Sequence, residues 1–348
     1  MATESFPPPL QAQKVDNPPD PKAQVGEGEV TAVIKRCLEF WFEDGNVILQ
    51  AEQIQFRVHI SVLSLHSNIF RDMANIAQKH QEDSADAVDH VNGCPLVHLW
   101  DKAVEIQHII SNIYHGVKVH NWTEPMTLSD ISILLRLGKK YEIDHLVAEG
   151  LRRLRADHPT TLAGWEKITS VEIYQAMDME GQFGDYADII NLAHEQSVHS
   201  ILPAAYLRCV LAGFDLKSFL PTTSILDLCT EARENCMVGR ESIIRAANGN
   251  FRLWRKRSGD LSPANGCTTL RPCMDKQAKA VEEFPLWKHD ILTGALLAPL
   301  KQTELAGFCP KCAKAVRAKY NECREDLWKK LPEMFNLSGW EGLKDFAM

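Results

Sequence analysis

The sequence predicts an α+β domain of short strands flanked by helices in its first half, followed by an all-α helical region. Short apolar segments bounded by turn residues predict strands near 47–49, 55–59 and 96–100. Apolar residues at helical spacing predict helices between the second and third strands and again after the third. Residues 160–250 show only helical spacing, so no strand is expected there.

Each early element of the α+β domain has a local signal. Asp44-Gly45 is typical of a turn before the first strand, and residues 50–54 connect that strand to the second as a hairpin. The segment 60–73 is apolar at helical spacing but is interrupted at Ser67-Asn68, which predicts two short consecutive helices. Polar residues 78–92 predict a loop before the third strand, whose Trp100 is expected to be buried.

Three amphipathic helices complete the domain. The first ends at Gly116, which suits a helix C-terminus, and five apolar residues share one of its faces: Ile106, Ile109, Ile110, Ile113 and Tyr114. Thr127 and Asp130 form a variant of the capping box at the start of the second. The third is expected from Ile143 to Leu154, before Pro159.

Composition divides the 348 residues into four predicted parts. Residues 1–29 are rich in proline and poor in apolar residues, which predicts a disordered tail. Residues 30–158 are expected to form the α+β domain and residues 159–258 a helical extension. Residues 259–348 are expected to form a cysteine-containing C-terminal segment with a final helix from Lys311 to about Lys330. A chain of this length has room for two or three cores.

Charge and hydropathy narrow the class of function. The net charge is −8 and no long basic run balances it, which argues against nucleic acid as a partner. The most basic stretch, residues 252–257, is interpreted as the polar face of a helix end. No run of 18 apolar residues and no secretory signal occurs, so no membrane association and an intracellular location, in the cytoplasm or nucleus, are expected.

The ten cysteines are expected to be reduced thiols or metal ligands, and Cys309-Pro310-Lys311-Cys312 is the sharpest chemical motif among them. A CxxC pair that enters a helix can direct two thiolates at one ion, and proline suits the first turn of a helix. Cys267 and Cys273 can complete a tetrahedral site of four thiolates for a structural zinc ion, with His289 as a substitute ligand.

Two other interpretations of these cysteines stay open. They can be ordinary reduced thiols, or the CxxC pair can be redox-active, which requires a thioredoxin-like strand before the helix. Cys323 follows Cys312 by eleven residues, about 16 Å along a continuous helix, so it cannot bind the same ion.

Several motifs, in this order of elements, resemble a BTB/POZ domain. Phe56-Arg57-Val58-His59, then Val62-Leu63 and Ser67-Asn68-Ile69-Phe70, is similar to the family's Phe-x-x-His strand end and Leu-x-x-x-Ser-x-x-Phe helical pair. Ile113-Tyr114-His115-Gly116 resembles its Ile-Tyr-Thr-Gly helix end. Two further segments resemble BTB proteins abundant in mushroom-forming (basidiomycete) fungi: residues 42–47 and the Leu-Pro-x-x-Phe-x-Leu-x-x-Trp pattern at 331–340.

The resemblance implies a protein–protein interaction adapter or scaffold with no catalysis of its own. Members of the family associate as homodimers and bind other proteins, in some cases a cullin-type ubiquitin ligase. Dimerising BTB transcription factors form a charged pocket where this chain has Asn46 and Ile60. The hydrophobic-x-Glu motif of cullin binders corresponds here to Ala103-Val104-Glu105.

The sequence contains no strong catalytic signature. A nucleophile elbow, a P-loop, a dinucleotide-binding glycine pattern and an HExxH motif are all absent, so no catalytic residue is predicted. His59, at a strand-to-helix junction, is interpreted as structural. Two alternative functions remain: a transcription-linked regulator that binds nucleic acid through residues 252–257 and the cysteines, and an enzyme that depends on Cys309 or Cys312.

Overall fold

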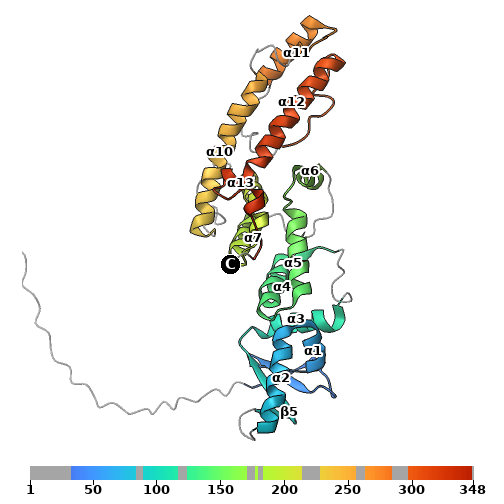
Figure 1. Ribbon diagram of the computed structural model, residues 1–348, viewed down its shortest axis with the longest axis vertical. Helices are drawn as coiled ribbons and strands as arrows, with labels where there is room; N and C mark the ends of the chain where they lie inside the picture. Colours follow the sequence, from blue (N-terminus) through green and yellow to red (C-terminus); the bar gives the residue numbers. More distant parts are fainter. Residues whose placement is uncertain are drawn as a thin grey trace, which may run out of the picture.

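The computed structural model describes residues 33–83, 89–116, 124–170, 177–178, 183–213, 228–255, 263–283 and 297–346. The predicted disordered tail, residues 1–29, and His289 lie outside these ranges. The molecule is elongated, with a sheet-containing domain at one end and a pair of long helices at the other (Figure 1).

A mixed sheet of five strands forms the first end of the molecule. Its strand order is β1-β3-β2-β5-β4. β2 and β3 form the predicted antiparallel hairpin, β5 runs parallel to β2, β1 runs parallel to β3, and β4 pairs antiparallel with β5. The strands are β1 (Lys35–Trp41), β2 (Val47–Ala51), β3 (Ile54–Val58), β4 (His90–Val91) and β5 (Cys94–Leu99).

Helices flank this sheet as predicted, and local capping explains where they begin and end. They are α1 (Ile60–His66), α2 (Asn68–Asp83), α3 (Ala103–His115), α4 (Leu128–Lys140) and α5 (Asp144–Asp157). The hydroxyl of Ser67 accepts a hydrogen bond from the Phe70 N–H at 3.1 Å and donates to the Tyr141 carbonyl, so α2 starts anew there and is tied to the end of α4. Thr127 caps α4 by accepting from the Asp130 N–H.

Three predictions for this region were wrong. β1 was not expected; most of its side chains are exposed, so it carries little of the apolar pattern that marks a buried strand. α2 continues to Asp83 and β4 pairs with β5, both within the predicted loop 78–92. Trp100 is 94% exposed instead of buried, because β5 ends at Leu99 and the chain turns away from the sheet.

A helical region follows, as predicted. Its helices are α6 (Leu162–Ser170), α7 (Phe183–Glu195), α8 (Leu202–Gly213), α10 (Thr230–Arg255), α11 (Leu270–Glu283), α12 (Pro310–Lys329) and α13 (Leu331–Met334), with short 3-10 turns at His199–Ile201 and Trp340–Gly342. The final helix expected from Lys311 to Lys330 is α12. The expectation of no strand was wrong at one point: β7 (Met177–Asp178) pairs with β6 (Met126–Thr127), and two residues are too few to produce a periodic pattern.

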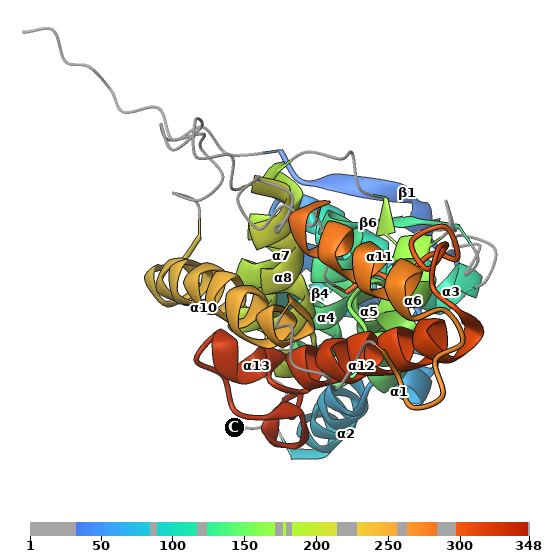
Figure 2. The ribbon, with the colours of Figure 1, turned by 90° about the horizontal axis from the view of Figure 1, so that it is seen from above.

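One apolar core extends from the sheet into the C-terminal helices. Phe335 is fully buried, stacks on Tyr206 of α8 with ring centroids 5.2 Å apart, and contacts Gly239 of α10. Figures 1 and 2 show α12 beside α10, and the two helices are in contact. The helical region and the segment after residue 297 therefore share a core, while the predicted domain limits stay predictions.

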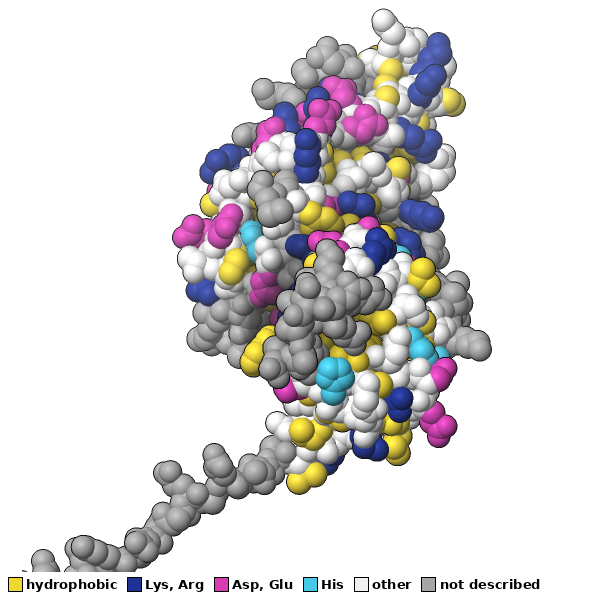
Figure 3. Space-filling model, turned by 60° about the horizontal axis from the view of Figure 1, so that its bottom comes forward, with side chains coloured by type: hydrophobic (Ala, Val, Ile, Leu, Met, Phe, Trp, Pro, Cys, Tyr) yellow, Lys and Arg dark blue, Asp and Glu magenta, His cyan; other side chains and the backbone are white. Residues whose placement is uncertain are grey.

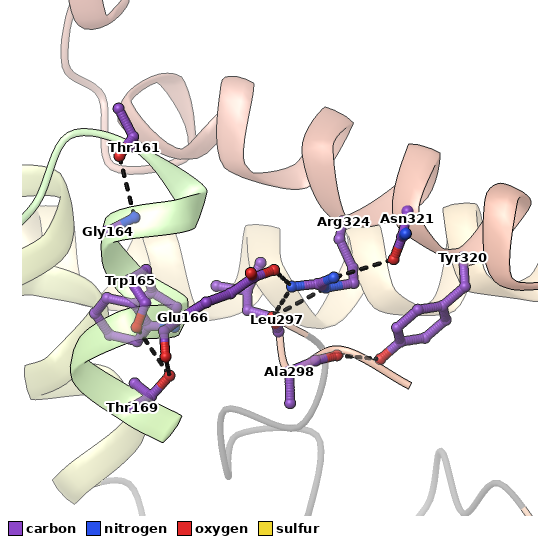
Figure 4. Close-up of polar contacts among 10 residues, drawn as sticks. All are labelled: Thr161, Gly164, Trp165, Glu166, Thr169, Leu297, Ala298, Tyr320, Asn321 and Arg324. Atoms are coloured by element: carbon purple, nitrogen blue, oxygen red, sulfur yellow. Dashed lines mark hydrogen bonds and ion pairs between the residues drawn. The ribbon is translucent and has the colours of Figure 1, made fainter. Parts of the chain in front are cut away.

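Polar contacts attach the C-terminal segment to the earlier helices. Arg324 of α12 is almost fully buried, pairs with Glu166 of α6 and donates to the Leu297 carbonyl (Figure 4). Near the end of the chain, Asp345 pairs with Arg155 of α5 and accepts hydrogen bonds from Ser200. Within the described residues, no helix combines the length and the apolar character needed to cross a bilayer.

Candidate functional site

The four cysteines predicted as metal ligands come together at the end of the molecule farthest from the sheet. Cys309 caps the N-terminus of α12, Cys312 lies in the first turn of that helix, Cys273 lies in the first turn of α11, and Cys267 precedes α11. Their sulfur atoms all lie within 4.8 Å of one another. Cys273, Cys309 and Cys312 are buried and Cys267 is half-buried. We call these four residues the cysteine cluster.

Hydrogen-bond donors point at the sulfur atoms of the cluster. The Cys309 N–H donates to the Cys273 sulfur at 3.2 Å, the Ala264 N–H to the Cys312 sulfur at 3.4 Å, and the Cys312 N–H to the Cys309 sulfur at 3.5 Å. Backbone N–H donors favour the thiolate over the thiol. Those of Cys312 and Thr268 lower the pKa of Cys309 to about 5, whereas desolvation raises the pKa of Cys267 to about 12.

The cysteine cluster forms a small core of its own, separate from the main one. Its buried members are Cys273, Cys309 and Cys312, and the partly buried Ala264, Cys267 and Phe308 pack against them. Sulfur thus takes the place that aliphatic side chains occupy in the main core.

A second candidate site is an exposed apolar surface at the sheet-containing end. Leu38 on β1 is 89% exposed, and Trp100, after β5, is almost wholly in solvent. Val33, Ile34 and Val104 are also exposed. Two contacts place these residues around the β2–β3 turn: the Lys35 N–H donates to the Gln53 carbonyl at 2.7 Å, and the Ala103 N–H to the Glu52 carboxylate at 2.8 Å.

Figure 3 turns this end toward the reader and shows hydrophobic side chains exposed among charged ones. β1 is an edge strand of the sheet, so its outer backbone groups face away from β3. We call β1 together with Val33, Ile34, Trp100 and Val104 the β1 surface. Sequence reasoning missed it, although Leu38, Phe40 and Phe42 alternate as strand residues do. The alternation does not predict which of these side chains are buried, because the pairing register of β1 with β3 shifts between Arg36 and Trp41.

His59 links the end of β3 to α3 and to the turn before β2. Its backbone N–H donates to the Tyr114 hydroxyl at 2.8 Å, and its Nδ1 lies 3.1 Å from the same oxygen. Its Nε2 lies 3.2 Å from an Asp44 carboxylate oxygen, and its ring packs against Phe42 with centroids 5.3 Å apart. Both ring nitrogens therefore have partners, which agrees with the predicted structural role.

A comparison with protein-family models matches residues 42–157 to the BTB/POZ domain. The match starts directly after β1, includes β2 to β5 and α1 to α5, and ends at the last residue of α5. Residues 42–157 of this chain form a BTB/POZ domain. A search of curated proteins finds no match to the chain.

The BTB/POZ domain is a general protein–protein interaction module. The predicted fold, a BTB/POZ domain with a short mixed sheet followed by a helical region, is confirmed. The β1 surface combines Trp100 and Val104 of the matched residues with β1 and the two residues before it.

The two departures from the family pattern have clear structural roles here. The Asn46 side chain accepts a hydrogen bond from the Ile60 N–H at 2.9 Å, so it caps the start of α1. Glu105, the acidic residue of Ala103-Val104-Glu105, pairs with Arg136 at 2.7 Å, and its side chain is only 13% exposed. The Glu105 carboxylate is therefore already paired with a residue of the same domain.

Two other features of the structure bear on catalysis and on nucleic-acid binding. An open cleft of about 400 Å³ between α4 and α7 is lined by Leu128, Ser129, Ser132, Asp188, Asn191, Leu192 and Glu195, a set without histidine, lysine or cysteine. Residues 252–255 continue α10, and residues 256–257 lie outside the described ranges. Binding of nucleic acid by the basic segment stays an untested prediction.

Proposed function

We propose that the chain is an adapter or scaffold that joins proteins through its BTB/POZ domain and catalyses no reaction of its own. The observation that carries the proposal is the nearly complete exposure of Trp100 on this domain and of Leu38 on β1, the strand directly before it. Large apolar side chains that gather on an exposed surface are typical of interaction sites, and tryptophan is enriched among residues that dominate binding energy. We expect such an adapter to act inside the cell, in the cytoplasm or nucleus.

Its first partner, in this proposal, is a second copy of the chain bound along β1. An exposed edge strand can pair with another strand through its free backbone groups, and a two-fold axis makes such an interface self-complementary. If two β1 strands pair antiparallel about a point between Cys37 and Leu38, Arg36 of each copy lies opposite Glu39 of the other. That charge complementarity supports self-association over binding of an unrelated strand.

A cullin-type ubiquitin ligase is the other partner class that the family implies. The ion pair between Glu105 and Arg136 argues against it, because a partner would have to break this pair to reach the carboxylate. The lining of the cleft between α4 and α7 places no histidine, lysine or cysteine beside its two serines.

The test is the subunit number of the full chain, measured by native mass spectrometry and by light scattering over a range of concentrations. We expect a dimer whose dissociation constant rises at least about 10-fold in Leu38→Asp, because the substitution places a charge at the centre of the interface. The matched control is Leu270→Asp. Leu270 is an exposed leucine at the first residue of α11, where an acidic residue suits the helix N-terminus.

A charge exchange tests the register. Arg36→Glu and Glu39→Arg are each expected to weaken the dimer, and the double variant is expected to restore it. A monomer at every concentration overturns self-association. A dimer that Leu38→Asp leaves unchanged overturns the assignment of the interface to β1.

A further inference from the structure

The spacing of the cysteine cluster fits a single metal ion. Four thiolates around a tetrahedral zinc ion, each about 2.3 Å from it, have their sulfur atoms about 3.8 Å apart. The Cys309 and Cys267 sulfurs are 3.8 Å apart, and all four sulfurs lie within 4.8 Å of one another. A disulfide would need about 2.05 Å. A cluster of several irons, with sulfide ions between them, would hold the cysteine sulfurs farther apart.

Hydrogen-bond donors surround the sulfur atoms of the cluster, as they do around metal-bound thiolates. Three backbone N–H groups donate to sulfur within the cluster, and the Thr269 hydroxyl lies 3.3 Å from the Cys273 sulfur. Donors of this kind orient and stabilise metal-bound thiolates. Four thiolates in one place repel one another unless a cation lies between them, and a tetrahedral set of soft sulfur ligands suits zinc.

Among residues 270–279 of α11, the buried contact is made by the cysteine cluster. Cys273 is the only one of these residues that is buried. Leu270 and Met274, the large apolar residues nearest to it, are exposed. An amphipathic helix is normally held by a stripe of buried apolar side chains. Over residues 270–279 one cysteine takes the place of this stripe, and a core this small needs a further stabilising link.

We propose that Cys267, Cys273, Cys309 and Cys312 bind one zinc ion, which fastens α11 and the turn before it to the N-terminus of α12. The ion is structural: its four protein ligands close the coordination sphere and leave no position for substrate. Cys323 takes no part, because α12 is continuous and carries it away from Cys312. The redox alternative lacks its usual support, since residues 297–308 contain no strand.

The first experiment is metal analysis of the full chain purified without chelator, by elemental analysis and native mass spectrometry. We expect one zinc per chain, and loss of that zinc in Cys309→Ser and in Cys312→Ser. Cys229→Ser, at an exposed cysteine outside the cluster, is the matched control and should keep the metal. Cys267→His should also keep it, because a Cys3His set binds zinc and Cys267 is the least buried member.

A second measurement guards against variants that fail to fold. After zinc is removed from the unmutated chain with a chelator, amide hydrogen exchange of residues 270–283 should become at least about 10-fold faster. Residues 320–329 of α12 should stay protected, because Tyr320, Leu327 and Trp328 belong to the main core. Cobalt substitution should give the visible and near-ultraviolet bands of a tetrahedral thiolate site.

Each contrary result overturns the proposal. If the purified chain contains no metal and the amides of α11 are nevertheless protected from hydrogen exchange, no ion is needed to hold α11. Iron in place of zinc refutes the metal assignment. A chain whose mass is lower by two hydrogens, with both atoms restored by reduction, shows a disulfide instead.

Discussion

His158 should make the stability of the folded chain depend on pH between about 6.5 and 3. It caps the C-terminus of α5, is fully buried, and lies 2.9 Å from the Leu154 carbonyl through Nδ1. Burial, with a smaller effect of the Arg208 charge, lowers its pKa to about 3. The folded state therefore keeps a neutral imidazole, whereas the unfolded chain binds a proton below its ordinary pKa of about 6.5.

The sign and size follow from linkage between folding and proton binding. Because the unfolded state binds more protons in this range, stability falls as the pH falls from about 6.5 toward 3. Each pH unit well inside the range costs about 1.4 kcal/mol. Between pH 7 and pH 5 the loss due to His158 is about 2 kcal/mol.

The assay is urea unfolding at several pH values, with His158→Asn as the test variant. The asparagine amide can replace the Nδ1–H donor toward the Leu154 carbonyl but does not titrate, so its cavity lowers stability by a similar amount at every pH. The unmutated chain should lose about 2 kcal/mol more than this variant between pH 7 and pH 5. His98→Gln, at an exposed histidine, is the control. Equal pH slopes for the unmutated chain and His158→Asn would refute the reasoning.

Three further substitutions test the main core and its polar attachments by urea unfolding at pH 7. Gly239→Ala places a methyl group where the Phe335 ring lies, so we expect the free energy of unfolding to fall by about 1–3 kcal/mol, less about 1 kcal/mol gained from the helix propensity of alanine. Adding Phe335→Leu to this variant should recover part of the lost stability. Full stability of the single variant would contradict the packing of Phe335 against Gly239. Arg324→Met leaves Glu166 and the Leu297 carbonyl without their donor, and we expect the free energy of unfolding to fall by about 3 kcal/mol. The control is Lys319→Met, at an exposed ion pair of the same helix, which should cost less than about 1 kcal/mol. Asp345→Asn removes the buried carboxylate that pairs with Arg155 and accepts from Ser200. We expect the free energy of unfolding to fall by about 2 kcal/mol and amide hydrogen exchange after residue 340 to become faster. Unchanged exchange would argue against this attachment of the chain end.

The parts of the fold that the sequence predicted are those with local signals. The Ser67-Asn68 break, the Thr127 cap and the apolar stripe of α3 each involve residues within about two turns of one another, and the structure contains all three. β1 and β7 depend instead on distant pairing partners, β3 and β6. A two-residue strand or a mostly exposed edge strand has no pattern that a window of the sequence can detect.

The candidate sites divide in the same way, into features with a local sequence signal and features that depend on distant contacts. The Cys309–Cys312 pair was visible from its spacing, and the helix that Cys312 enters was predicted. That Cys267 and Cys273 reach the same place depends on how α11 packs, because Cys309 follows Cys273 by 36 positions in the sequence. The β1 surface was missed because exposure of Trp100 depends on where β5 ends, and an apolar residue after a strand is more often buried.

The two proposals concern opposite ends of one elongated molecule, and this makes them separable. The main core connects the BTB/POZ domain to α12, whereas the cysteine cluster forms its own small core beyond it. Removing zinc should therefore free α11 without changing the subunit number. Conversely, Leu38→Asp should dissociate the dimer without releasing zinc. If zinc removal or Leu38→Asp changed both the subunit number and the zinc content, the main core would have to couple the two ends of the molecule. The protection of α12 from hydrogen exchange would then be lost at the same time.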